Sequence, residues 1–109
     1  MRHVLFVCSQ NKLRSPTAET VFSEVEGFEV SSAGLNNDAE VTLTPELVEW
    51  ADTIFVMENT HRNKLQKKFR KYLKNQRVMV LGIPDEFDYM DEELVSILKN
   101  KLDNYFTLK

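Results

Sequence analysis

The sequence has one cysteine, two histidines and no long hydrophobic run. A single cysteine excludes an internal disulfide and any metal site built from several thiolates. No apolar stretch approaches the roughly 18 residues that a membrane-spanning helix needs, and the apolar run at residues 4–7 is too short for a signal peptide. His3 and His61 are far apart in the chain, so we expect neither a catalytic pair nor a metal site from them. These absences favour a cytoplasmic protein that works without a metal.

The length of 109 residues, with 42% hydrophobic and 28% charged residues, fits one globular domain spanning residues 1–109. The net charge of −3 hides an uneven distribution. Residues 1–58 contain three Lys or Arg against ten Asp or Glu, whereas residues 59–84 contain eight Lys or Arg and no acid. Six acidic residues then follow between residues 85 and 93. A basic segment is therefore followed by an acidic one.

Short apolar runs rich in β-forming residues alternate with segments whose apolar residues recur every three or four positions, the spacing of a helix face. We expect strands at residues 3–8, 28–33, 52–57 and 77–81. We expect helices at residues 16–26, 45–51, 60–73 and 91–104. Each connection between strands is long enough to be a helical crossover, which predicts parallel strands. The expected fold class is α/β: a single doubly wound domain with a four-stranded parallel sheet, strand order 2-1-3-4, and helices on both faces.

Proline, glycine and capping residues mark several boundaries of these elements. Ser15 and Thr44 each precede a proline, and a capping residue followed by proline is typical of a helix start. We expect Gly27 to end the first helix and Gly34 to end the second strand. Asp91 can cap the last helix.

Residues 8–15, here named the Cys8 loop, lie at the turn from the first strand into the first helix. A helix N-terminus offers unpaired N–H groups and a partial positive charge that bind anions, and it favours the ionised form of a nearby thiol. Cys8 could therefore attack phosphorus, while the planar guanidinium of Arg14 holds the phosphoryl oxygens. Ser15 could hydrogen-bond the thiolate, cap the helix, or do both. The backbone N–H groups expected to cradle the phosphate belong to Ser9, Gln10, Asn11, Lys12 and Leu13.

The Cys8 loop resembles that of the low-molecular-weight protein tyrosine phosphatases. The resemblance rests on Cys8 and Arg14 in C-x5-R spacing, on Asn11 between them, and on Ser15 and Pro16 directly after the arginine. It extends to residues 18–19, 32–34 and 52–59. It implies a phosphocysteine intermediate on Cys8 without a metal or other cofactor, and a phosphorylated protein or another phosphomonoester as substrate.

The resemblance also implies that Asn11 and Ser32 support the shape of the Cys8 loop by hydrogen bonds. From the residues alone, Asn11 could simply tolerate a left-handed backbone. The family carries its general acid in an Asp-Pro pair ahead of the last helix, whereas this chain has the reversed order Pro84-Asp85. Its spacing from the last helix favours Asp85 as the general acid, with Asp88 as the alternative, although either could be a solubilising surface acid.

Several features depart from the family or extend beyond the motif. The chain is shorter than typical members, mainly between residues 34 and 52, which predicts a more open rim. Lys12 stands where the family usually has a small or apolar residue; there it would favour polyanionic substrates and disfavour a phosphorylated guanidinium, unless it simply faces solvent. Phe87 and Tyr89 could form an aromatic wall beside the leaving group, although either could belong to the core.

The basic helix expected over residues 62–74 could contact nucleic acid, although a solvated helix face is the simpler interpretation. Its charged residues are Arg62, Lys64, Lys67, Lys68, Arg70, Lys71 and Lys74. His61 is expected near the start of this helix.

Three other functions fit parts of the pattern. A single-cysteine arsenate reductase would need an external thiol, because the chain has no second cysteine for a disulfide relay. A phosphoryl carrier would also place a cysteine after its first strand, but it needs neither an arginine clamp nor an acid. A weakly active regulator could bind nucleic acid through the basic helix. The phosphatase accounts for the most features.

Overall fold

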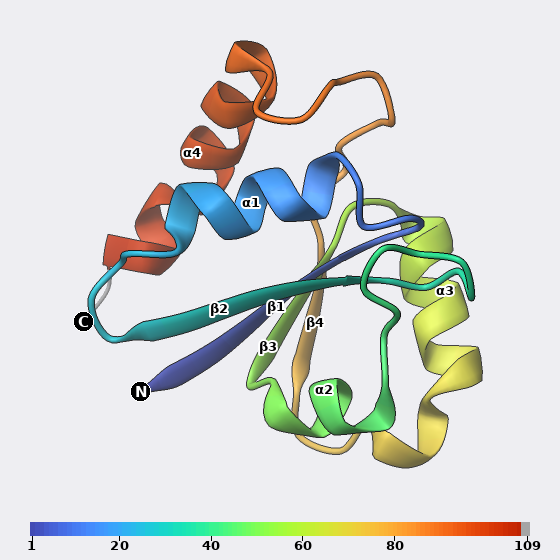
Figure 1. Cartoon of the computed structure of the whole chain (residues 1–109). Helices are drawn as coiled ribbons and strands as arrows, with labels where there is room; N and C mark the ends of the chain where they lie inside the picture. The colour runs from blue at the N-terminus through green and yellow to red at the C-terminus, as the bar shows by residue number, and fades with distance from the viewer. Residues whose placement is uncertain (108–109) are drawn as a thin grey trace.

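The computed structural model describes residues 1–107, in which four strands alternate with helices (Figure 1). The strands are β1 (Arg2–Cys8), β2 (Phe28–Gly34), β3 (Thr53–Val56) and β4 (Arg77–Val80). The helices are α1 (Arg14–Phe22), α2 (Pro45–Trp50), α3 (Asn59–Lys68), the short 3-10 helix η1 (Arg70–Tyr72) and α4 (Glu92–Thr107). All strand pairs are parallel and the order is β2-β1-β3-β4, so the predicted topology is confirmed.

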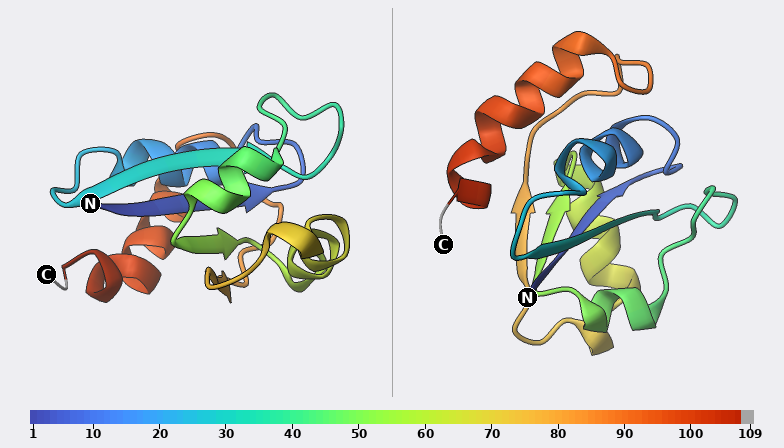
Figure 2. Two further views of the ribbon diagram at one scale, coloured as in Figure 1. Left: turned by 90° about the horizontal axis from the view of Figure 1, so that it is seen from below. Right: turned by 60° about the vertical axis from the view of Figure 1, so that its left-hand side comes forward.

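Helices cover both faces of the sheet (Figure 2), and a layer of hydrophobic side chains lies between the helices and each face. On one face α1 and α4 pack against the sheet, and the rings of Phe6 and Phe22 stack there. On the other face α2 and α3 pack over Leu5 and Ile54. The central strands β1 and β3 are buried on both faces, as the inner strands of a parallel sheet must be.

The start of α1 differs from the prediction. The helix begins at Arg14, Leu13 takes the capping position, and no side chain caps the first turn. Ser15 lies inside that turn with its hydroxyl bonded to Cys8 and Asn11, so its expected role as a cap is wrong. Pro16 fits this first turn because the first four N–H groups of a helix have no intrahelical acceptor.

Other boundaries of helices and strands also differ from the prediction. The helix α1 ends at Phe22 rather than near residue 26, and Gly27, with a φ of 89°, lies in the turn that enters β2. Gly34 is the last residue of β2 and pairs with Cys8, so it belongs to the strand. Thr44 caps α2 as predicted, since its Oγ1 accepts the Leu47 N–H at 3.2 Å.

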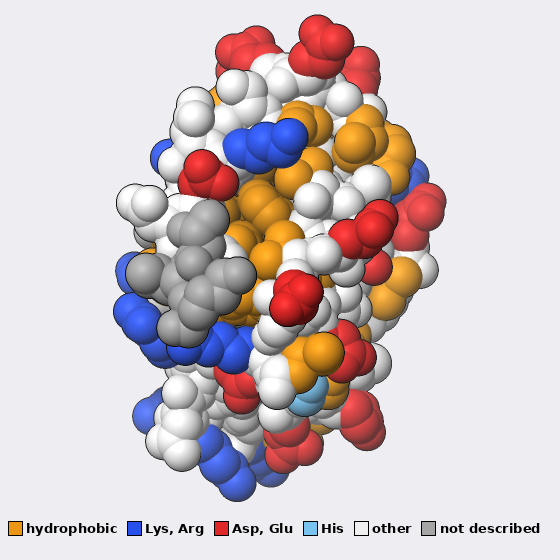
Figure 3. All heavy atoms as spheres, turned by 90° about the vertical axis from the view of Figure 1, so that its left-hand side faces the viewer, with side chains coloured by type: hydrophobic (Ala, Val, Ile, Leu, Met, Phe, Trp, Pro, Cys, Tyr) orange, Lys and Arg blue, Asp and Glu red, His pale blue; other side chains and the backbone are white. Residues whose placement is uncertain are grey.

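The basic segment forms two pieces instead of one helix over 62–74: α3 ends at Lys68 and η1 follows. The acidic segment leads into α4, and acidic side chains gather at the end of the molecule where that helix begins (Figure 3). Among residues 1–107 there is no helix with both the length and the apolar character needed to cross a membrane.

The carboxyl ends of the parallel strands meet at one edge of the sheet, the place where open α/β sheets bind ligands. Cys8 ends β1 beside Gly34 at the end of β2. The segment after β2 then runs along the Cys8 loop, because the N–H groups of Leu35 and Asn36 donate to the carbonyl oxygens of Cys8 and Ser9 at 2.9 and 3.0 Å. The sheet therefore brings four parts of the chain together around Cys8: its own loop, the segment after β2, and the segments that follow β3 and β4.

Candidate active site

Cys8 is the last residue of β1 and is only 3% exposed. The backbone N–H of Asn11 donates to its Sγ at 3.3 Å, and the Ser15 hydroxyl lies 2.9 Å from the same sulfur. The loop therefore curls around the sulfur and directs two polar groups at it. A sulfur held in this way, at the N-terminus of a helix, has the surroundings of a nucleophile.

A chain of hydrogen bonds supports this arrangement. The buried Asn11 side chain donates from Nδ2 to the hydroxyls of Ser15 and Ser32, each at 2.9 Å. Ser32 in turn donates to the carboxylate of Glu19 on α1. Because Ser15 Oγ already accepts from Asn11, its own proton can point to Cys8 Sγ. These hydrogen bonds connect Glu19 to Cys8, and the role of Glu19 was not predicted from the sequence.

Two backbone features make this close packing possible. Asn11 has a φ of 57°, in the left-handed region that asparagine tolerates better than most residues. A Cβ atom at Gly34 would lie 2.6 Å from Ser9 O and 3.0 Å from Asn11 N. Only glycine lets the Cys8 loop lie directly on the end of β2.

Arg14, on the first turn of α1, is held by two other segments. Its Nη1 donates to the carboxylate of Glu58 in the segment after β3. The same nitrogen donates to the carbonyl oxygen of Ile83, in the segment after β4, at 2.8 Å. Its Nε lies 3.8 Å from Asp85 Oδ1. The hydrogen bond from Arg14 lowers the pKa of Glu58 below its ordinary value of 4.5, although partial burial opposes this. With Nη1 occupied, the Nε and Nη2 edge is the part of the guanidinium left to bind an oxyanion.

His61 connects α3 to the Cys8 loop and is 2% exposed. Its Nδ1 accepts the Glu58 backbone N–H at 3.1 Å, which forms the capping box of α3, and its Nε2 lies 3.0 Å from Ser9 Oγ. Since a backbone N–H can only donate, Nδ1 carries no proton and Nε2–H donates to Ser9. Burial, followed by the positive charge of Arg14, lowers the pKa of His61. His61 thus lies at the helix start, as expected, while its contact with Ser9 was not predicted.

The remaining predicted residues belong to the loop before α4 or to the exposed part of the Cys8 loop. Asp85 has a side chain that is 66% exposed and is the acidic residue paired with Arg14 from the loop before α4. Asp88 is exposed, and its carboxylate is not among those that pair with Arg14. Phe87 is half-buried against the layer formed by α1 and α4, and Tyr89 is bonded through its hydroxyl to Thr20 at 2.9 Å. Lys12 is exposed.

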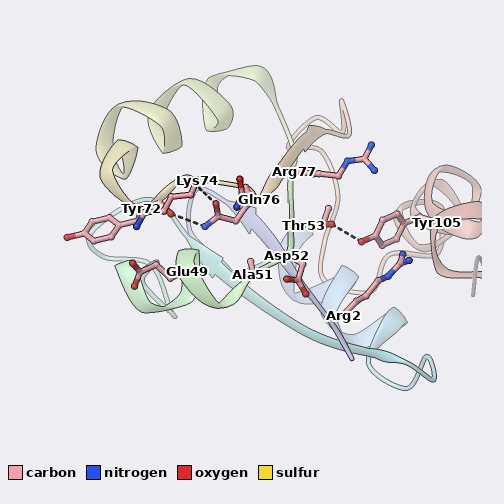
Figure 4. Close-up of a pocket in the computed structure, with 11 residues that line it drawn as sticks. Arg2, Glu49, Ala51, Asp52, Thr53, Tyr72, Lys74, Gln76, Arg77 and Tyr105 are labelled. Carbon is pink, nitrogen blue, oxygen red and sulfur yellow. Dashed lines mark hydrogen bonds between the residues drawn. The ribbon is translucent and has the colours of Figure 1, made fainter.

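A hollow of about 640 Å³ lies away from Cys8, at the amino ends of the strands (Figure 4). Polar side chains along its wall bond to nearby protein atoms: Gln76 Nε2 donates to two backbone carbonyls, and the Tyr105 hydroxyl donates to Thr53. Within residues 1–107, no group of three or more His, Cys, Asp or Glu side chains could hold a metal ion. The arrangement at Cys8 is therefore the candidate active site.

Comparison with known proteins gives one family match. The model of a family described as low molecular weight phosphotyrosine protein phosphatase matches residues 3–51, which contain β1 from His3 onward, the Cys8 loop, α1, β2 and α2. None of the curated proteins matches the chain in a search of their sequences.

Similar solved structures cover nearly the whole chain. A mutant of YwlE from Bacillus subtilis superposes with a TM-score of 0.76 and 24% identity, covering 99% of this chain and 100% of that one. SP-PTP, a low molecular weight protein tyrosine phosphatase from Streptococcus pyogenes, gives a TM-score of 0.81 at 17% identity, covering 98% and 92%. The tyrosine phosphatase Wzb from Escherichia coli K30, in complex with phosphate, gives 0.73 at 20% identity, covering 96% of each chain. These likenesses show a shared fold, and with the family match they confirm the resemblance that the sequence motif indicated.

Proposed function

We propose that this protein is a phosphomonoester hydrolase of the low-molecular-weight protein tyrosine phosphatase type, with Cys8 as its nucleophile. The proposal depends chiefly on one observation: the Asn11 N–H and the Ser15 hydroxyl converge on Cys8 Sγ, at the carboxyl edge of the sheet and on the same loop as Arg14. The family match over residues 3–51 supports the proposal independently of this geometry.

In the first step the Cys8 thiolate attacks phosphorus, the bond from phosphorus to the ester oxygen breaks, and a phosphocysteine forms. The leaving oxygen takes a proton from the general acid. In the second step water attacks the phosphocysteine, the general base accepts the water's proton, and the sulfur leaves as a thiolate that the Ser15 hydroxyl stabilises. Arg14 and the backbone N–H groups of residues 9–13 bind the phosphoryl oxygens in both steps.

Asp85 is the proposed general acid and base. It lies on the loop before α4 within 3.8 Å of Arg14 Nε, on the guanidinium edge that would face the phosphoryl group. Asp88, three residues further on, is not among the residues that form an ion pair with Arg14, which are Glu58 and Asp85. A positioned proton donor contributes about 10²- to 10⁴-fold to a rate. We therefore expect Asp85→Asn to lower kcat by that factor, both for esters with a good leaving group and for esters with a poor one. Asp88→Asn is the matched control.

The test of the mechanism is hydrolysis of p-nitrophenyl phosphate. We expect Cys8→Ser to abolish turnover, and the wild-type protein to yield a phosphate-labelled Cys8 when it is quenched in acid during turnover. Urea unfolding of both proteins controls for misfolding. Hydrolysis by Cys8→Ser at the wild-type rate would show that the reaction does not pass through this sulfur.

The substrate class is a separate proposal. The similar structures include tyrosine phosphatases, and they also include two YwlE proteins described as arginine phosphatases, one of them from Geobacillus stearothermophilus. For this chain we favour an oxygen ester such as phosphotyrosine, because the exposed Lys12 in the Cys8 loop would repel a phosphorylated guanidinium. We also infer a reducing compartment such as the cytoplasm, since Cys8 must remain a free thiol to act.

A further inference from the structure

A basic groove of about 500 Å³ lies beside the Cys8 loop, and we name it the α3 groove. Its lining residues are Leu35, Asn36, Asn37, Lys64, Lys67 and Lys68. Both of its walls are joined to Ser9, the residue after the nucleophile. The Asn36 N–H donates to Ser9 O from one wall, and His61 on α3 contacts Ser9 Oγ from the other. Figure 1 shows the start of α3 and the segment after β2 on the same side of the turn into α1.

The lysines of the groove run away from the site along α3. His61, Lys64 and Lys68 are spaced by three and four residues, so they lie on one face of the helix. At 1.5 Å per residue, Lys64 lies about 4.5 Å and Lys68 about 10.5 Å along the helix axis from His61. Lys68 Nζ bonds Leu35 O and Asn37 Oδ1, each at 3.2 Å, and so links the two walls. Lys64 and Lys67 are exposed, and neither forms an ion pair with a carboxylate of the described chain.

The opposite side of the site carries the opposite charge. The loop that places Ile83 and Asp85 against Arg14 continues into the acidic residues before and within the first turn of α4. A ligand that reaches Arg14 therefore meets Lys64 and Lys67 along α3 and several carboxylates on the α4 side. The exposed acids Asp38 and Glu40 follow in the segment after β2 but do not line the groove. This asymmetry favours a ligand with acidic groups on one side of its phosphate only.

We propose that the α3 groove binds Asp or Glu side chains adjacent to the phosphorylated residue of a protein substrate. This inference rests on the proposed function and narrows its substrate class. A short acidic segment can occupy the groove without approaching the α4 side. The groove has no aromatic side chain for base stacking, which disfavours nucleic acid as its ligand.

The test compares two phosphotyrosine peptides that differ only in three flanking residues, glutamates in one and glutamines in the other. We expect the wild-type protein to prefer the acidic peptide in kcat/KM by about threefold to tenfold, the size expected for two or three exposed ion pairs, and to lose most of this preference in 0.5 M salt, roughly where screening becomes short-ranged. The variant Lys64→Gln/Lys67→Gln should reduce the ratio to near one. The control Lys99→Gln/Lys101→Gln removes the same charge from exposed positions on α4 and should retain the preference.

Each outcome bears on a different claim. Equal kcat/KM for the two peptides, with normal hydrolysis of p-nitrophenyl phosphate, would overturn the groove inference and leave the phosphatase proposal intact. An equal loss of preference in the two double variants would show that net charge, and not the groove, selects the peptide, and would overturn it as well. If a phosphorylated oligonucleotide is hydrolysed more efficiently than the acidic peptide, the ligand of the groove is nucleic acid and the inference of an acidic peptide is wrong. If the protein hydrolyses no phosphomonoester, both the proposed function and this inference are wrong.

Discussion

Replacement of Asn11 tests the hydrogen-bond chain that positions Cys8. In Asn11→Ala two buried hydrogen bonds disappear, those to Ser15 and Ser32, each 2.9 Å long. At about 0.5–1.5 kcal/mol for each bond, this loss amounts to roughly 1–3 kcal/mol. Alanine must also adopt the left-handed backbone at φ 57°, which costs about 1–2 kcal/mol. We therefore expect Asn11→Ala to lower the free energy of unfolding by roughly 2–5 kcal/mol.

Asn11→Gly separates the two contributions. Glycine loses the same hydrogen bonds but adopts a positive φ without steric cost. Glycine also makes the unfolded chain more flexible, and this reduces the stability advantage of the glycine variant by about 0.4–1 kcal/mol. The glycine variant should therefore be more stable than the alanine variant by roughly 0.5–1 kcal/mol. Both should lose about 10- to 100-fold in kcat/KM, because the Ser15 hydroxyl is no longer oriented toward Cys8.

The measurements are urea unfolding and hydrolysis of p-nitrophenyl phosphate by the two variants. Asn100→Ala, at an exposed position on α4, is the matched control and should change stability by less than about 0.5 kcal/mol. If the alanine variant equals the glycine variant in stability, the backbone at residue 11 is not constrained as we argue. If both keep the wild-type kcat/KM, the hydrogen-bond chain does not position the nucleophile.

Two further predictions concern the contacts around the Cys8 loop. Gly34→Ala should lower the free energy of unfolding, measured in urea, by about 2 kcal/mol or more, because its Cβ would overlap Ser9 O. In the control Gly27→Ala the added Cβ meets nothing within 4 Å, so this variant should show only the cost of a positive φ. Equal losses of stability in the two variants would contradict the reasoning. The pKa of His61 is lowered in the folded protein, so the unfolded chain binds its proton first as pH falls. The stability that neutral His61 contributes is complete above its ordinary pKa of 6.5 and declines below it. The difference in unfolding free energy between wild type and His61→Asn should thus be smaller at pH 5.5 than at pH 7.5, whereas a constant difference would mean that His61 is not held neutral.

Much of the fold follows from interactions between near neighbours in the chain. The buried strands, the Leu94, Leu98 and Leu102 stripe of α4 and the Thr44 cap depend on spacing and capping, which act within a few residues. The alternation of strands and helices then restricts the connections to crossovers between parallel strands. These patterns also place the Cys8 loop at the carboxyl edge of the sheet. The start of α1 at Arg14 was not predicted, because the Ser15 hydroxyl bonds Cys8 and Asn11 instead of capping the first turn.

Local sequence patterns are thus enough to predict the alternating α/β order, the strand-to-helix loop and the spacing of Cys8 and Arg14 within it. The residues that surround this loop depend on tertiary contacts. Glu58 and His61 reach it from positions 44 and 52 residues away from their partners Arg14 and Ser9, and the α3 groove combines a helix with a segment after β2. Contacts of this kind depend on the register in which distant strands pair, which no local spacing or composition encodes.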